Sequence, residues 1–386
     1  MNSENNINTG KEQNFFDIPL NLDIKQTDLD VNSKTRSSKF KWRGQFSPQF
    51  AELLIKKYSN AGDTVFDPFS GSGTVIGEAI AQKRSAIGIE LNPAAFYMSD
   101  FYRVLTLKLP EKERLITIIE RIFSESPHDT IQKMFNDDNG NVQSLAGLLV
   151  VLAEIEGDEI DPDTILNVWQ EIKFDLVTAN YENSVITYLG DARNEFLKSE
   201  SADITITSPP YINVLNYHQQ YRKSMEYLSW NILGIAKNEV GSNRKNRGNR
   251  FYSVEDYVKD MTDIIRNTIH ATKQGGRIIY VVGRESTVLG EKFYNGEIIY
   301  KIFMLLNQKM LARQKRTFKN RFGVLITEDI LHFESSNTLM TSQDIVEEGL
   351  SKIIVETLSA HLETVSTDRK SLLEKAINRA KELKKI

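Results

Sequence analysis

A strand, a glycine-rich turn, a helix and a second strand follow one another early in the chain, and this unit constrains the fold most strongly. The first strand candidate runs from Thr64 to Phe66, DPFSGSGT then leads into a helix over 75–82, and SAIGIEL is the second strand. Both strand candidates are mostly apolar, which favours burial on both faces of a sheet. We therefore expect a doubly wound α/β fold.

This α/β pattern is interrupted once and then resumes. Helix-like segments joined by Asp/Asn/Gly-rich turns fill 104–181. Four more strand candidates follow, in NSVITYLGDAR, ADITITSPPY, GGRIIYVVG and GVLITEDILHFE, so we expect about seven strands. The predicted organisation is a mobile polar arm (1–38), a first part of the core (39–103), a helical insertion (104–181), a second part of the core (182–335) and a helical C-terminal appendage (336–386).

The absence of cysteine from all 386 residues narrows the chemistry. It excludes disulfides, cysteine-ligated zinc and a thiolate nucleophile. Methylation at C5 of a pyrimidine needs a covalent cysteine adduct, so that reaction is excluded too. We predict no metal site.

The sequence also predicts a cytoplasmic protein without a membrane partner. The longest strongly apolar run, Leu145 to Ala153, is too short to cross a bilayer. The N-terminal sequence MNSENNINTGKEQNFF lacks the basic and apolar regions of a signal peptide.

The formal net charge is -4, so binding to nucleic acid would depend on local basic segments. Two segments carry cations and no acid, namely 241–250 (GSNRKNRGNR) and 309–321 (KMLARQKRTFKNR). For either segment alone, a solvated surface is an equal alternative. Together they predict DNA contacts, which we assign to Arg244, Lys245, Arg247, Arg250, Lys315 and Arg316.

The turn FDPFSGSGT (66–74) is the first motif with a chemical implication. Gly71 and Gly73 allow the backbone to turn tightly at the carboxyl end of a strand, where open α/β sheets bind ligands. The turn lacks the Gly-Lys-Ser/Thr of a triphosphate site, and Ile76 stands where a dinucleotide site has its third glycine. A plain strand-to-helix turn is the alternative interpretation.

Acidic residues stand at three strand ends, at Asp67, Glu90 and Asp191. Glu90 is placed to accept hydrogen bonds from ribose hydroxyls, and Asp191 from an adenine amino group. Phe69 would add a cation–π contact to a cationic centre. A ligand with a cationic centre, a ribose and an adenine suits this set, which predicts S-adenosylmethionine. For Glu90 the alternative is a strand-end acid in solvent.

A strand that runs directly into Ser-Pro-Pro-Tyr is the second motif (DITITSPPY, 203–211). The two prolines fix the backbone and remove two donors, so Ser208 and the Pro209 carbonyl become rigid acceptors. Such acceptors would hold both N–H groups of an exocyclic amine and aim its nitrogen for direct in-line methyl transfer. Tyr211 would stack on the base, which must leave the duplex to enter the pocket. A rigid turn before a helix is the alternative.

DPFSGSGT, IGIELNP and TSPPYIN together resemble the S-adenosylmethionine-dependent DNA amino-methyltransferase family. GQFSPQFAELLIKKYSNAGDTVFDP is similar to the segment that packs over the methionine part of the cofactor in that family, and KNRFGVLITEDILHF resembles its closing strands. The resemblance extends from Lys41 to Phe333 outside the insertion and implies a Rossmann-like methyltransferase sheet. It implies a cofactor site of Phe46, Asp67, Pro68, Phe69, Gly71, Gly73, Thr74, Glu90, Leu91 and Asp191, and a catalytic site of Ser208, Pro209, Pro210 and Tyr211.

Serine at the first position of the tetrapeptide is typical of the cytosine-N4 members, whereas Asp or Asn is typical of the adenine-N6 members. The resemblance therefore implies methylation of cytosine N4 in double-stranded DNA, with a cognate restriction endonuclease as a candidate partner. Adenine N6 is the first alternative, and RNA or a protein amide is a further one. A non-catalytic DNA-binding module would require damaged motifs, and none is damaged.

The cofactor motif precedes the catalytic motif, which reverses the order common among Ser-Pro-Pro-Tyr enzymes. The target-recognition region therefore stays open between 230–256 and the helical insertion. We expect His218 to contact DNA or to lie on a helix surface rather than to act as a base, because the amine proton can leave to solvent after transfer.

Overall fold

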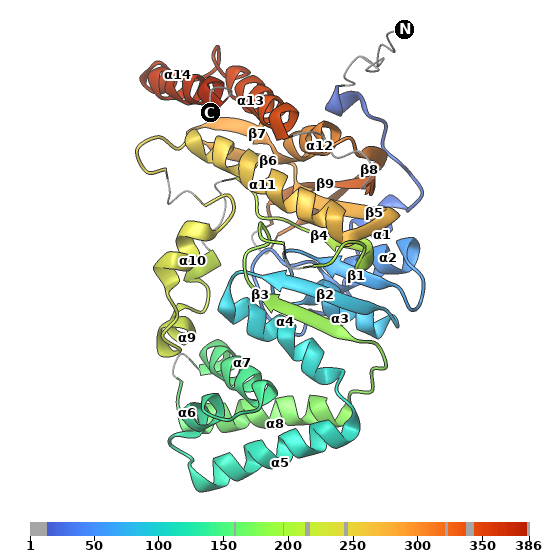
Figure 1. The fold of residues 1–386 in the computed structure, drawn as a ribbon, viewed down its shortest axis with the longest axis vertical. Helices are drawn as coiled ribbons and strands as arrows, with labels where there is room; N and C mark the ends of the chain where they lie inside the picture. The colour runs from blue at the N-terminus through green and yellow to red at the C-terminus, as the bar shows by residue number, and fades with distance from the viewer. Residues whose placement is uncertain are drawn as a thin grey trace.

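The structure, a computed structural model, describes residues 14–157, 160–195, 197–212, 217–242, 246–320, 323–336 and 343–383. A seven-stranded sheet lies in the middle of the molecule with helices on both faces (Figure 1). One group of helices extends beyond the β3 edge of the sheet, and the C-terminal helices lie at the opposite end of the molecule (Figure 1). The predicted doubly wound α/β fold is confirmed.

The strand order in the sheet is β3-β2-β1-β4-β5-β9-β8. The first five strands in this order are parallel, and β9 is antiparallel to both β5 and β8. The seven strands are β1 (Thr64–Asp67), β2 (Ser85–Glu90), β3 (Val185–Leu189), β4 (Ala202–Thr207), β5 (Thr272–Gly283), β8 (Lys309–Lys319) and β9 (Leu325–Glu334); β6 (Glu285–Val288) and β7 (Glu291–Tyr294) form a separate two-stranded sheet.

β1 and β4 are neighbours at the point where the strand order reverses. The chain runs outward from β1 to β2 and β3, and then returns to place β4 on the other side of β1. Their register pairs Val65 with Ile204 and Phe66 with Thr205. The glycine turn after β1 and the Ser-Pro-Pro-Tyr segment after β4 therefore leave the same edge of the sheet, where ligands of open α/β sheets bind.

Alternate side chains of the strands contribute to two different apolar cores, because successive residues of a strand point to opposite faces. Val65 and Ile279 share a core with α2 and α3, whereas Phe66 and Ile278 share one with α11 and α12. Burial on both faces explains why these strands are apolar runs in the sequence. The helices of these two layers are α2 (Pro48–Tyr58), α3 (Thr74–Ala81), α11 (Tyr252–Ala271) and α12 (Asn295–Leu305).

Four helices occupy most of the segment that we expected to be a helical insertion. They are α5 (Leu109–Glu125), α6 (Thr130–Phe135), α7 (Gly140–Gly157) and α8 (Pro162–Thr178), and they share an apolar core with α4 (Pro93–Leu105). A Cβ atom at Gly147 of α7 would lie 2.4 Å from the ring of Tyr97 on α4. The close packing of these two helices therefore requires glycine at position 147.

Part of the N-terminal segment differs from the mobile arm that we expected for 1–38. Residues 14–38 form η1 (Phe15–Asp17) and α1 (Gln26–Leu29), and the side chains of Phe15 and Leu29 are buried. The Arg313 guanidinium lies 4.0 Å from the centroid of the Phe15 ring and donates a 2.9 Å hydrogen bond to the Phe15 carbonyl. Because the partners lie almost 300 residues away in the sequence, local periodicity could not reveal this packing. Residues 1–13 lie outside the described residues.

The remaining elements are η2 (Tyr217–Gln219), α9 (Arg222–Tyr227), α10 (Ile232–Asn238), α13 (Gln343–Ser359) and α14 (Thr367–Glu382). The last two helices contribute buried Ile354, Leu358 and Leu373 to the core around α11 and α12. Over the described ranges, every helix is too short or too polar to span a bilayer.

Candidate active site

A cavity opens at the carboxyl ends of β1, β2, β3 and β4. It encloses about 890 Å³ that no protein atom fills, counting the space that opens to solvent. Its walls come from segments far apart in the sequence, namely 42–46, 67–71, 74–75, 89–92, 190–192 and 238–240, together with Ser208, Pro210, Tyr217 and Ile264.

This cavity brings together most of the site residues predicted from the sequence. The predicted cofactor residues that line it are Phe46, Asp67, Pro68, Phe69, Gly71, Thr74, Glu90, Leu91 and Asp191. Ser208 and Pro210 of the catalytic motif line it as well, whereas Gly73, Pro209 and Tyr211 do not. The glycine turn and the Ser-Pro-Pro segment therefore meet at one cavity.

Asp67 is a buried carboxylate at the end of β1. Its Oδ1 atom accepts hydrogen bonds from the Thr207 hydroxyl (2.6 Å) and the Phe69 amide (3.0 Å). In the part of the chain that the structure describes, no Lys or Arg forms an ion pair with Asp67. Burial raises the pKa of Asp67 to about 7, although both hydrogen bonds lower it. The cavity thus contains an anionic group without a cationic partner from those residues.

Glu90 connects the glycine turn to the start of α4. Its Oε2 atom accepts a 2.8 Å hydrogen bond from the Gly71 amide, and its Oε1 atom accepts one of 2.8 Å from the Asn92 amide. Burial raises the pKa of Glu90 to about 7, and the nearby Asp67 carboxylate also raises it. A second carboxylate, whose hydrogen-bond donors among the described residues are backbone amides, therefore lines the cavity.

Gly73 and Thr74 have different roles in the turn. Gly73 has a φ of +82°, and a Cβ atom there would lie 2.8 Å from the Cα atom of Ser99, so the backbone at 73 requires glycine. Thr74 begins α3 and lines the cavity, and its hydroxyl is buried without a hydrogen-bond partner in the described structure. Buried polar atoms nearly always have partners, so this hydroxyl indicates a polar ligand.

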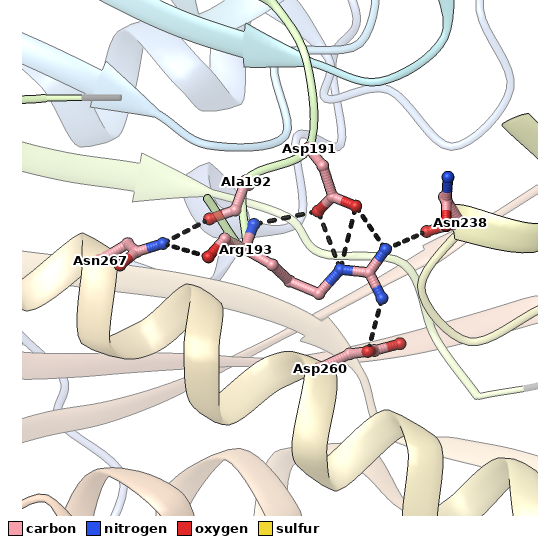
Figure 2. A network of polar contacts seen from close by, with 6 residues as sticks. All are labelled: Asp191, Ala192, Arg193, Asn238, Asp260 and Asn267. Carbon is pink, nitrogen blue, oxygen red and sulfur yellow. Dashed lines mark hydrogen bonds and ion pairs between the residues drawn. The ribbon is translucent and has the colours of Figure 1, made fainter. Parts of the chain in front are cut away.

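Asp191 lies at the edge of the cavity in a network that the sequence did not predict (Figure 2). Both of its carboxylate oxygens accept hydrogen bonds from Arg193, whose backbone amide also donates to Oδ1 at 3.0 Å. Arg193 further donates to Asp260 on α11 (2.6 Å) and to the carbonyl of Asn238 (2.9 Å). These acidic partners, Asp191 first, raise the pKa of Arg193. Asp191 is therefore held in place by Arg193.

Tyr211 contacts the protein interior rather than the cavity. Its hydroxyl donates a 3.1 Å hydrogen bond to Oε1 of Glu328 on β9, and a Cβ atom at Gly283 would lie 2.5 Å from its ring. Burial raises the pKa of Tyr211 well above 10. The ring therefore packs against β5, and its expected stacking on a base stays a prediction.

The basic segment 309–321 differs from our expectation. Most of it forms strand β8. The sequence did not reveal a strand there, because positions that face inward carry arginines where a strand pattern would have apolar residues. Arg316 is buried, and its Nε atom donates a 2.6 Å hydrogen bond to Glu328, so Arg316 does not lie on an exposed DNA-binding surface. Lys315 is partly exposed on the same strand. In the segment 241–250, Arg247 and Arg250 are exposed, whereas Arg244 and Lys245 lie outside the described residues.

Sequence reasoning missed several residues at the cavity. Glu239 lines it and binds the Nδ1 atom of the fully buried His218 at 2.7 Å. His218 is therefore not the surface residue that we expected. Trp42 and Tyr217 also line the cavity, and their rings stack. In the sequence, the placement of Trp42 between Lys41 and Arg43 was the one feature that could have indicated a functional segment.

Residues 7–100 match the family model of the N6 and N4 methyltransferases, which is described as "DNA methylase". Two curated relatives from Methanocaldococcus jannaschii also match. Type II methyltransferase M.MjaII is 38% identical over 52 residues, which is 14% of this chain and 10% of the relative. Type II methyltransferase M.MjaI is 38% identical over 68 residues, which is 18% of this chain and 20% of the relative. These matches support the DNA amino-methyltransferase family.

The matched segments thus span at most a fifth of either relative's length. Two solved structures with a similar arrangement are a SAM-dependent methyltransferase from Methanosarcina mazei and the rRNA methyltransferase aviRa from Streptomyces viridochromogenes. The first has a TM-score of 0.36 at 10% identity and covers 73% of this chain and 96% of its own. The second has a TM-score of 0.35 at 11% identity, and the match covers 81% of this chain and 94% of that structure's chain.

The family match supports S-adenosylmethionine as the cofactor, and the cavity residues fit it. Its sulfonium is cationic, and the cavity presents the carboxylates of the buried Asp67 and the partly buried Glu90. Its methionine part is polar, and the hydroxyl of Thr74, the first residue of α3, lacks a hydrogen-bond partner among the described residues. Its adenosine part is flat and mostly apolar on its faces, which suits Phe69 and Leu91.

Proposed function

We propose that this chain is a DNA methyltransferase that transfers a methyl group from S-adenosylmethionine to the exocyclic N4 of a flipped-out cytosine. The observation that carries the proposal is that Ser208 and Pro210 line the same cavity as Asp67 and Glu90. A methyl donor and an acceptor amine can therefore meet in one site, which is the condition for direct transfer.

In this proposal the cofactor is held from three sides. The carboxylates of Asp67 and Glu90 stabilise the positive charge and accept hydrogen bonds from the ribose hydroxyls. Thr74 and the amides at the start of α3 bind the methionine carboxylate. Asp191, oriented by Arg193, accepts from the adenine amino group. Apolar contacts and the tight turn come from Phe46, Pro68, Phe69, Gly71, Gly73 and Leu91.

S-adenosylmethionine supplies an electrophilic methyl group when it is bound. The task of the protein is then to orient a weakly nucleophilic amine. The Ser208 hydroxyl and the Pro209 carbonyl accept hydrogen bonds from the two N–H groups, so that the nitrogen lone pair is aimed at the methyl carbon. The rigid Pro209-Pro210 backbone holds these acceptors in place before the reaction, which lowers the reorganisation cost. The surplus proton leaves the nitrogen to solvent.

Tyr211 contributes indirectly in this proposal. Because its hydroxyl is bound to Glu328, we propose that it anchors the catalytic segment to β9 instead of stacking on the base. The core would consist of 39–103 and 182–335, with 104–181 as a helical insertion, and DNA contacts would include Arg247 and Arg250.

Cytosine N4 is proposed because Ser208 stands at the first position of the catalytic tetrapeptide. The matched family model is named for both N6 and N4 enzymes, so adenine N6 is the second candidate. The names of the two type II relatives make a restriction-modification context, with a cognate endonuclease, part of the proposal.

Nucleoside mass spectrometry of plasmid DNA after incubation with the purified protein and S-adenosylmethionine tests the proposal. We expect N4-methylcytosine. N6-methyladenine without N4-methylcytosine would assign the second candidate, and labelling of tRNA without labelling of duplex DNA would refute DNA as the substrate. Sequencing that detects modified bases in DNA from expressing cells would add the sequence context.

A further inference from the structure

Two segments about 180 residues apart join at the wall of the cavity. The Trp42 and Tyr217 rings stack with an interplanar angle of 14° and centroids 6.0 Å apart, and the Trp42 and Tyr221 centroids are also 6.0 Å apart. Trp42, Arg43 and Tyr217 all line the cavity. We call residues 41–43 the rim strap.

Hydrogen bonds hold the rim strap in place on both sides of Trp42. The Tyr221 hydroxyl donates to the Lys41 carbonyl, and the Arg43 amide donates to the Gln220 side chain at 3.0 Å. Trp42 also lies over the glycine turn, since a Cβ atom at Gly71 would be 3.2 Å from its ring. The rim strap is therefore fixed relative to both the cofactor turn and the segment that follows the catalytic motif.

The charges around the rim strap are unbalanced. The segment 36–46 contains four cations and no acid. Arg36 is paired with Glu52 and Glu78, and Lys39 is paired with Asp175. Lys41 and Arg43 are exposed, and neither has a carboxylate partner within ion-pair distance among the residues that the structure describes. Two exposed cations, Arg43 on the cavity wall and Lys41 two residues before it, are thus available for an anionic ligand.

From this arrangement we infer that Lys41 and Arg43 bind the phosphates that flank the nucleotide entering the cavity. The inference rests on the proposed function. A flipped nucleotide remains covalently linked to its strand, so its two neighbouring phosphates must lie at the mouth of the cavity that accepts the base. Paired Lys and Arg side chains at that mouth neutralise phosphates and release counterions.

The basic segment on β8 is the competing location, and its two arginines are compensated. Arg313 is paired with Asp329 at 2.8 Å and Arg316 with Glu328 at 2.6 Å, and both arginines are buried. β8 is also the last strand of the sheet, separated from β4 by β5 and β9. The rim strap, in contrast, contributes Arg43 directly to the cavity wall.

The test compares three double variants that each remove two positive charges. Lys41→Ala/Arg43→Ala removes the rim cations, Lys315→Ala/Lys319→Ala removes exposed or partly exposed cations of β8, and Lys375→Ala/Lys381→Ala removes exposed cations of α14 as the control. Binding of a duplex containing the methylated site, identified beforehand by sequencing, is measured by fluorescence anisotropy from 50 to 200 mM salt. Calorimetry measures the affinity for S-adenosylmethionine.

We expect the rim variant to raise the Kd for DNA about tenfold to a hundredfold at 100 mM salt. The magnitude of the slope of log K against log salt should fall by about 2, because each lost phosphate contact contributes roughly 0.9. The β8 and α14 variants should change the Kd less than about threefold. Because Arg43 lines the cavity, calorimetry of the rim variant separates any change in S-adenosylmethionine affinity from the change in salt slope, which reports phosphate contacts alone. If the Lys41→Ala/Arg43→Ala variant does not fold, Arg43→Gln alone takes its place, and the expected change in salt slope is then about 1.

An unchanged salt slope in the rim variant, or an equal loss in the β8 variant, would overturn the inference. A rim effect on an RNA duplex without one on DNA would overturn it as well. The proposed function fails by a different observation, namely that wild-type protein methylates no DNA base. The two failures are therefore distinguishable.

Discussion

The hydroxyl of Tyr211 donates a 3.1 Å hydrogen bond to Oε1 of Glu328, although 117 residues separate the two in the chain. Arg316 donates to the other carboxylate oxygen of Glu328 at 2.6 Å. The arginine and the glutamate come from β8 and β9, so the antiparallel edge of the sheet supports the segment that follows β4. The position of the Tyr211 side chain is therefore fixed by an interior partner.

This relationship predicts a loss of turnover without loss of cofactor binding in Tyr211→Phe. Removing one hydrogen bond of about 1.4 kcal/mol should lower kcat for methyl transfer about tenfold, because the catalytic segment is less well held. Single-turnover methylation and calorimetry with S-adenosylmethionine measure the two quantities. An unchanged kcat would show that the hydrogen bond does not position the segment.

Glu328→Gln should destabilise the fold as well. The buried Arg316 would lose its anionic partner, and breaking a buried ion pair costs about 3–5 kcal/mol. Glu334→Gln on the same strand is the control, because the ion pair between Glu334 and Lys309 is exposed and spans 3.6 Å. This variant should change the unfolding free energy by no more than about 0.5 kcal/mol. Urea unfolding measures both, and equal values for the two variants would contradict the assignment.

Ser208→Ala should separate chemistry from binding. The loss of one acceptor aimed at the reacting amine should lower kcat about 100-fold, the scale seen when a preorganised hydrogen-bonding group is removed. Affinity for S-adenosylmethionine should change less than about twofold, since Asp67, Glu90 and Thr74 are untouched. Near-wild-type turnover in Ser208→Ala would refute the proposed mechanism.

Cofactor binding should tighten as pH rises through neutrality. The pKa values of Asp67 and Glu90 are raised to about 7 from 3.8 and 4.5, so the free folded protein holds these protons more tightly than the unfolded chain does. These two groups should therefore lower the stability of the free protein as the pH rises from about 4 to about 7. A bound cation favours the ionised carboxylates, so binding should release protons near pH 7.

Calorimetry in two buffers of different ionisation enthalpy counts the released protons, and thermal melts at pH 5.5 and 8 with and without S-adenosylmethionine report the stability change. Asp67→Asn should remove part of the proton release and weaken binding. Cofactor affinity that stays constant from pH 5.5 to 8 would show that these carboxylates do not respond to the ligand.

Arg193→Ala should weaken both the fold and the cofactor site. Arg193 links Asp191, Asp260 and the Asn238 carbonyl, so its removal breaks contacts between three segments around the cavity (Figure 2). We expect a loss of about 1–3 kcal/mol in unfolding free energy and a clear loss of cofactor affinity. Arg193→Lys should recover part of both. If only stability changes, Asp191 does not contribute to cofactor binding.

Much of the site was predictable from local sequence. The first two strands, the glycine turn and the Ser-Pro-Pro segment are encoded by neighbouring residues, through apolar runs, the φ freedom of Gly73 and the rigidity of Pro209. Their meeting at one edge follows from the rule that parallel strands present their carboxyl ends together. For this reason the fold class and eleven of the residues that line the cavity could be predicted before the structure was known.

The tertiary structure alone decided which charged and aromatic residues are buried and which remain available. Arg316 resembled Lys41 as a surface cation in the sequence, but the register of β8 with β9 places Glu328 opposite it. Tyr211 is directed inward by the same glutamate, and Trp42 meets Tyr217 only because the fold brings their segments together. The environment of a charge or a ring depends on partners that are distant in the chain, and local patterns do not encode those partners.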